Sequence, residues 1–96
     1  MRIEQTRIRR GEILKVLYRY LPEHVGDNLL HQIFTEDTPT SINGQLRYLE
    51  EKGYIELCKV RKDYSTATVM AKIKPMGVDL LEGSIEPDPG IVLPEL

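Results

Sequence analysis

The spacing of apolar residues changes at Gly53 from the period of a helix to the period of a strand. Before Gly53, apolar residues recur every three or four positions, as along the buried stripe of a helix. After Gly53 they alternate with polar residues, as in a half-buried strand. A chain that carries both periods in this order is expected to be α+β, with helices followed by a short antiparallel sheet.

The part before Gly53 predicts three helices, at residues 10–21, 27–34 and 39–52. The first is expected to end before Pro22, because the residue preceding a proline avoids helical angles. Gly11 leaves the start of this helix open, because glycine costs about 1 kcal/mol relative to Ala in a helix interior. The apolar faces contain Ile13, Leu14, Val16, Leu17, Tyr18, Tyr20 and Leu21 in the first helix, Leu29, Leu30, Ile33 and Phe34 in the second, and Ile42, Leu46 and Leu49 in the third.

Particular residues mark the ends of the second and third helices. Asp27 is expected to cap the second by accepting a bond from an otherwise unpaired amide. Thr38 is expected to cap the third, with Pro39 in the first helical position, where its fixed φ suits the helix. Gly53 fits the left-handed residue that follows a helix.

The part after Gly53 predicts strands at residues 54–60 and 66–74, joined by a polar turn at 61–65. Pro75 is expected to begin a short helix that ends near Gly83. A two-stranded hairpin is marginal alone, so it must pack on the helices. We therefore expect a three-helix core with a β-hairpin and a short C-terminal helix.

The chain has 96 residues, which predicts one domain. We place that domain at residues 1–83 and an extended, acidic tail with three prolines at residues 84–96. Apolar residues at 85 and 91–93 suit a tail that lies across its own domain or a neighbouring subunit. A disordered tail is the alternative. The single Cys58 allows no intrachain disulfide, and no apolar run approaches about 18 residues, so a cytoplasmic protein without a membrane partner is expected.

Two stretches carry a resemblance to a known family: LRYLEEKGYI at residues 46–55 and IKPMGVDLLE at residues 73–82. Together with the order of the elements, they resemble the winged helix-turn-helix family of DNA-binding domains, especially ArsR- and MarR-like bacterial regulators. The resemblance covers roughly residues 10–82. It implies that helix 39–52 is the recognition helix, which enters the major groove, and that residues 61–65 form the tip of the wing.

The outward side chains of helix 39–52 include types that read bases. Asn and Gln bond adenine with two hydrogen bonds, and Arg does the same with guanine. Gly44 has no Cβ and would allow a close backbone approach. An ordinary solvated helix face has the same composition, and this alternative stays open. The candidate residues on this helix are Thr40, Ser41, Asn43, Gln45, Arg47 and Tyr48.

The predicted hairpin is more basic, with a net charge of +4 over residues 59–74. Basic groups there would contact phosphates, or would discourage strand pairing at the sheet edge. The candidate residues are Lys59, Arg61, Lys62, Tyr64 and Lys72. The N-terminal arm adds Arg2, Arg7, Arg9 and Arg10, which would either reach phosphates or form a basic first helical turn.

The net charge of −2 divides unevenly along the chain. Residues 1–76 carry +3, and residues 77–96 carry −5. Dedicated DNA-binding domains are often more basic than this body, so the charge alone leaves a role without DNA open.

No metal site or catalytic centre is expected. His24 and His31 are seven positions apart with a break at Gly26 between them, and Cys58 stands alone in a predicted strand. No His and carboxylate are spaced to activate that thiol, and no glycine-rich phosphate loop is present. We predict that the chain is not an enzyme and binds no metal or cofactor.

Two functional hypotheses remain. The first is a small DNA-binding transcriptional regulator, in which a homodimer would present two recognition helices about one DNA turn apart. A phage or mobile-element origin would suit so small a regulator. The second is a winged-helix module for protein interaction or assembly that binds no nucleic acid, which the near-neutral body and the apolar tail favour.

Overall fold

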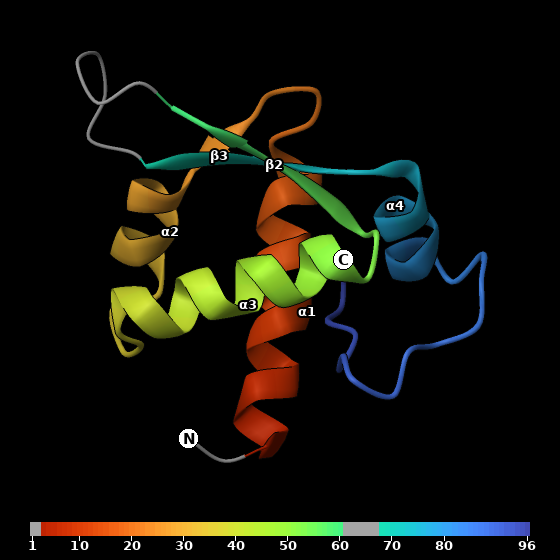
Figure 1. Ribbon diagram of the computed structural model, residues 1–96. Coiled ribbons are helices and arrows are strands. Elements are labelled where there is room, and N and C mark those ends of the chain that lie inside the picture. Colours follow the sequence, from red (N-terminus) through yellow and green to blue (C-terminus); the bar gives the residue numbers. More distant parts are fainter. Residues whose placement is uncertain (1–2, 61–67) are drawn as a thin grey trace.

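The computed structural model describes residues 3–60 and 68–96, and in these ranges the chain is α+β, with four helices and a three-stranded antiparallel sheet. The helices are α1 (Ile3–Arg19), α2 (Asp27–Ile33), α3 (Pro39–Glu51) and α4 (Pro75–Glu82). The strands are β1 (Val25–Gly26), β2 (Ile55–Lys59) and β3 (Val69–Ile73). Figure 1 shows α3 crossing α1 beneath the sheet, with α2 and α4 on opposite sides of α1.

The core lies between the sheet and the helices. Alternation along β2 and β3 turns Ile55, Ala71 and Ile73 inward, and Ile55 lies opposite Ile73 in the antiparallel register. The helices add apolar stripes at helical spacing, and the side chains with no more than 1 % exposure are Ile13, Leu14, Leu17, Leu30, Ile42, Leu46, Leu49 and Leu80. The apolar face predicted for the first helix is therefore mainly core, although Tyr20 and Leu21 are exposed.

α1 is longer at its start than predicted and two residues shorter at its end. It begins at Ile3, so Gly11 lies in the helix interior. Gly11 is buried, and a Cβ added there would lie 2.0 Å from the Val92 carbonyl oxygen. Glycine is thus required by a segment 81 positions away, which local propensity cannot reveal. At the other end, the Leu21 N–H bonds to the Tyr18 carbonyl in a tighter turn before Pro22.

β1 was not predicted. Its two residues pair with the middle strand, Val25 opposite Ala71 and Gly26 opposite Met70, which gives the strand order β1-β3-β2. The predicted two-stranded hairpin is thus part of a three-stranded sheet. The predicted turn at residues 61–65 lies outside the described residues.

The prediction for the Asp27 carboxylate was wrong. The N-cap of α2 is Gly26, which has no side chain to accept a bond, and Asp27 is the first helical residue. Its buried carboxylate instead accepts bonds from the Thr68 N–H and hydroxyl and from the Val69 N–H. Burial raises the pKa of Asp27, but these bonds outweigh it and leave the pKa lowered. Asp27 therefore joins α2 to β3 and does not cap its own helix.

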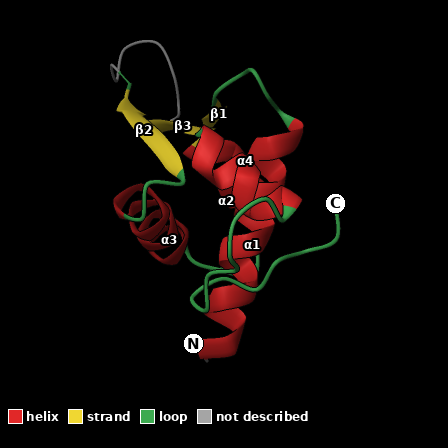
Figure 2. Ribbon diagram, turned by 90° about the vertical axis from the view of Figure 1, so that its right-hand side faces the viewer, coloured by secondary structure: helices red, strands yellow, loops and turns green. Residues whose placement is uncertain are grey.

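The C-terminal segment 84–96 packs on its own domain, and Figure 2 shows it passing alongside α1. Ile91 is buried, and the Val92 N–H bonds to the Arg7 carbonyl of α1. Of the helices in the described ranges, none is both long and apolar enough to span a bilayer.

Candidate nucleic-acid interface

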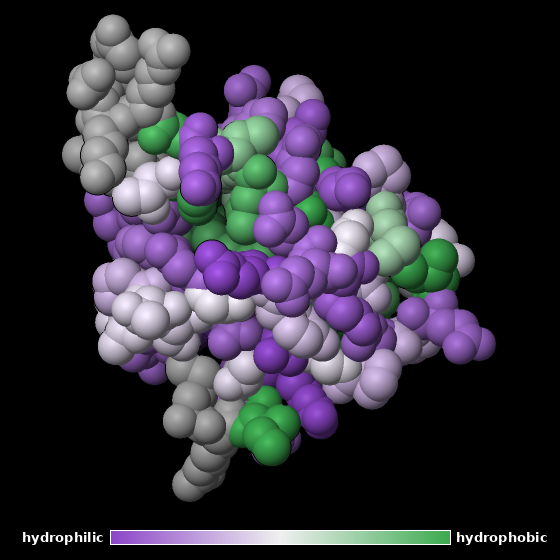
Figure 3. Space-filling model, viewed as in Figure 1, coloured by the Kyte–Doolittle hydropathy of each residue, from purple (hydrophilic) through white to green (hydrophobic). Residues whose placement is uncertain are grey.

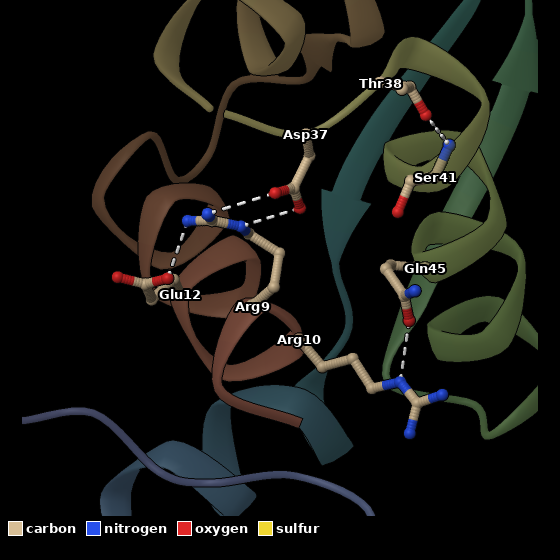
Figure 4. Close-up of polar contacts among 7 residues, drawn as sticks. All are labelled: Arg9, Arg10, Glu12, Asp37, Thr38, Ser41 and Gln45. Carbon is tan, nitrogen blue, oxygen red and sulfur yellow. Dashed lines mark hydrogen bonds and ion pairs between the residues drawn. The ribbon is translucent and has the colours of Figure 1, made fainter. Parts of the chain in front are cut away.

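α3 forms where local chemistry predicts it. The Thr38 hydroxyl accepts a bond of 3.1 Å from the Ser41 N–H, and Pro39 is the first helical residue (Figure 4). Gly53, at a φ of +86°, follows the helix in the left-handed conformation. Because Ile42, Leu46 and Leu49 face the core, the opposite side of α3 faces solvent.

The outer face of α3 carries a shallow, open hollow of about 330 Å³, lined by Thr40, Asn43, Gly44 and Arg47. All four residues are exposed, and a Cβ built on Gly44 would meet no atom within 4 Å. Figure 3 shows that the surface over α3 is largely hydrophilic, whereas hydrophobic surface lies between α3 and the strands, at the right-hand side of the view and at its lower end. Within the described ranges, no ion pair engages Arg47.

Asn43 is oriented by α2. Its Oδ1 lies 3.0 Å from Nε2 of His31, so the imidazole donates to the amide oxygen when that nitrogen carries the proton. This contact leaves the amide N–H₂ group of Asn43 available to donate. It also joins α2 to α3, which residues 34–38 connect in the chain.

Gln45 and Tyr48 are turned toward α1 and bound there. Arg10 donates from Nε to Oε1 of Gln45 at 2.8 Å (Figure 4), and its guanidinium carbon lies 3.5 Å from the centre of the Tyr48 ring. The same guanidinium donates to the Gly90 carbonyl at 3.0 Å. Both side chains are half-buried. Gln45 and Tyr48 therefore join α3 to α1 and, through Arg10, to the C-terminal segment.

Arg9 makes a similar joint with the turn before α3. Its guanidinium donates to both carboxylate oxygens of Asp37, at 2.9 and 3.3 Å, and to Glu12 at 2.8 Å (Figure 4). It also lies 4.5 Å from the centre of the Phe34 ring. Burial lowers the pKa of Arg9, but Asp37 and Glu12 outweigh it and leave the pKa raised. No local pattern could have revealed the ion pair of Arg9 with Asp37, since the two residues are 28 positions apart.

Of the other candidate residues, Ser41 is half-buried in the first turn of α3, and Lys59 is exposed at the end of β2. Lys72 is half-buried on β3, opposite Glu56 of β2. Arg61, Lys62 and Tyr64 lie outside the described residues, as does Arg2 of the N-terminal arm. The structure thus brings Thr40, Asn43 and Arg47 together on one surface and directs Gln45 and Tyr48 away from it.

Asp88 fixes the C-terminal segment beside the end of α3. Its carboxylate accepts bonds from the Tyr54 hydroxyl at 2.7 Å and the Gly90 N–H at 2.8 Å, and it pairs with Lys52 at 3.0 Å. Burial raises the pKa of Asp88, but these partners outweigh it and the pKa is lowered. Burial, followed by the bond to Asp88, raises the pKa of Tyr54 to about 12.

Comparison with known proteins gives no family assignment: no family model, curated protein or solved structure matches this chain.

Proposed function

We propose that the chain is a small winged-helix DNA-binding protein that acts in transcriptional regulation, with α3 as the recognition helix. The observation that carries the proposal is the hollow on the exposed face of α3. There a side chain that can read guanine (Arg47) and one that can donate to adenine (Asn43) flank a glycine that admits close approach.

The helix-turn-helix pair and the β2–β3 pair support this proposal. α3 leads directly into β2, so basic residues of the hairpin follow the recognition helix in the chain. In this proposal Lys59, which is exposed at the end of β2, would contact phosphates beside the groove that α3 enters. The proposed reading set is Thr40, Asn43 and Arg47, since Gln45 and Tyr48 are bound to Arg10.

The basic charge available to DNA is smaller than the sequence suggests. Arg9 and Arg10 are held in bonds within the domain, so they add little to phosphate binding. We therefore expect weak non-specific binding, with specificity carried by few side chains.

Selection of duplexes from a random library at low salt, followed by anisotropy titrations with the selected duplex, tests the proposal. Log affinity should fall linearly with log salt, and Lys59→Ala should reduce the slope by about 1 if this lysine contacts one phosphate. Arg47→Ala should cost about 1–3 kcal/mol on the selected sequence and much less on random duplex. Arg19→Ala, which removes the same charge from the end of α1, is the matched control.

The absence of duplex binding at low salt would overturn the proposal and favour the module for protein interaction. An equal loss of affinity in Arg47→Ala and Arg19→Ala would show that α3 does not read bases. The stoichiometry of the same titration, one or two chains per duplex, tests the expected homodimer.

A further inference from the structure

The sheet brings together three metal-ligating residues that are scattered in the sequence. Glu56 and Cys58 are two positions apart on β2, so their side chains share one face, opposite to that of the buried Ile55. His24 directly precedes β1, the strand at the other edge of the sheet. The three donor atoms therefore meet across the outer face of β3.

The donor atoms are close enough to share one ion. The imidazole nitrogen, the carboxylate oxygen and the sulfur all lie within 4.8 Å of one another. Nε2 of His24 is 3.9 Å from Oε1 of Glu56. Tetrahedral zinc with bonds of about 2.0–2.3 Å needs its donors roughly 3.5 Å apart. Since all three residues are exposed, small side-chain rotations can close this difference and solvent can deliver the ion.

The chemistry of the three donors selects the metal. A thiolate excludes the hard ions Mg²⁺ and Ca²⁺, and a set of imidazole, thiolate and carboxylate suits Zn²⁺. The thiolate and the carboxylate also balance the double charge of the ion. We propose that His24, Glu56 and Cys58 form a Zn²⁺ site with three protein ligands, whose fourth position is open to water or another ligand.

The neighbouring charge is Lys72, which lies opposite Glu56 on β3. Among the described residues, the ion pair of Glu56 is with His24, and none is formed with Lys72. The carboxylate is therefore already directed to the other metal ligand. A bound ion would bridge the two edge strands of the sheet, and this proposal does not depend on DNA binding.

The single cysteine makes the test direct, because the alkylation rate of the protein reports on Cys58 alone. With untagged protein, one equivalent of Zn²⁺ should bind per chain and slow alkylation of Cys58 by iodoacetamide. Co²⁺ in its place should give the visible bands of a tetrahedral site and a thiolate charge-transfer band. Loss of a residue that only hydrogen-bonds a metal ligand weakens metal binding by about 10–100-fold. Because His24 and Glu56 would bind the ion directly, His24→Ala and Glu56→Gln should each weaken Zn²⁺ binding by at least this factor.

Cys58→Ser should abolish the charge-transfer band. His31→Ala and Glu50→Gln are the matched controls, and both should bind Zn²⁺ like the wild type. Because every substituted side chain is at least partly exposed, circular dichroism should be unchanged in each variant. Failure to bind one equivalent of Zn²⁺, binding that survives His24→Ala or Cys58→Ser, or one ion shared by two chains would each overturn the proposal.

Discussion

The hydroxyl of Tyr54 donates a hydrogen bond of 2.7 Å to the carboxylate of Asp88, 34 positions further along the chain. Tyr54 directly precedes β2, and Asp88 lies in the C-terminal segment, so this buried bond joins that segment to the sheet and to the end of α3. A buried carboxylate needs such partners, because its desolvation is otherwise unfavourable.

Tyr54→Phe removes the donor and leaves Asp88 with Lys52 and Gly90. We expect a loss of about 1–3 kcal/mol in the free energy of unfolding, since a hydrogen bond to a buried charge is lost. Urea denaturation measures this loss. Tyr18→Phe removes an exposed hydroxyl bond to Glu82 and should cost less. Equal effects of the two substitutions would contradict the role of burial.

The same pair predicts the pH dependence of stability. Asp88 has a lowered pKa when folded, so its stabilising contribution is present at neutral pH and is lost as pH falls below about 4. Tyr54 has a pKa raised to about 12, so its contribution is present below the ordinary pKa of tyrosine and is lost as pH rises toward 12. The free energy of unfolding, measured as a function of pH, should fall less steeply at acid pH in Asp88→Asn than in the wild type. At alkaline pH it should fall less steeply in Tyr54→Phe. Unchanged slopes would contradict these shifts.

Gly11→Ala and Gly44→Ala should have opposite effects, although both lie inside helices. At Gly44 the added methyl meets nothing within 4 Å, so helix propensity should stabilise the protein by about 0.5–1 kcal/mol. At Gly11 the methyl would collide with the Val92 carbonyl, and we expect a net loss of about 1–3 kcal/mol. Thermal denaturation of both variants checks the signs. In a chain truncated after residue 90, which lacks the Val92 carbonyl, Gly11→Ala should no longer lower the free energy of unfolding. A loss that persists in the truncated chain would contradict this explanation.

Arg10→Lys keeps the charge but loses the planar group that bonds Gln45 and Gly90 and stacks on Tyr48. We expect a loss of about 1–3 kcal/mol in the free energy of unfolding. Arg47→Lys, at an exposed position, should change it by less than about 0.5 kcal/mol. Denaturant titration of the two variants separates a structural arginine from one that is free for a ligand, and equal losses would contradict this distinction.

The parts of the fold that sequence reasoning predicted correctly are those with local causes. The Thr38 cap, Pro39, the glycine at position 53 and the stripe of Ile42, Leu46 and Leu49 fix α3 within a window of 16 residues, from 38 to 53. What was missed depends on distant partners. β1 exists only through pairing with β3, and two residues carry no period that could reveal it.

The candidate sites show the same division. The exposed character of Asn43 and Arg47 follows from the helical period of α3, whereas the inward turn of Gln45 depends on Arg10, 35 positions earlier. The proximity of His24 to Cys58 likewise depends on the strand order β1-β3-β2. The sequence pattern predicted only two strands, so it did not bring His24 near Cys58.

The bond from Arg10 to the Gly90 carbonyl closes a loop that contains most of the chain, since the two residues are 80 positions apart. Closing so long a loop costs entropy before its contacts form, and a topology rich in such contacts folds more slowly than a helical bundle of the same size. Folding experiments should therefore find that α1 and segment 88–92 acquire protection from hydrogen exchange together and late, while the turn and helix at 38–53 are protected early.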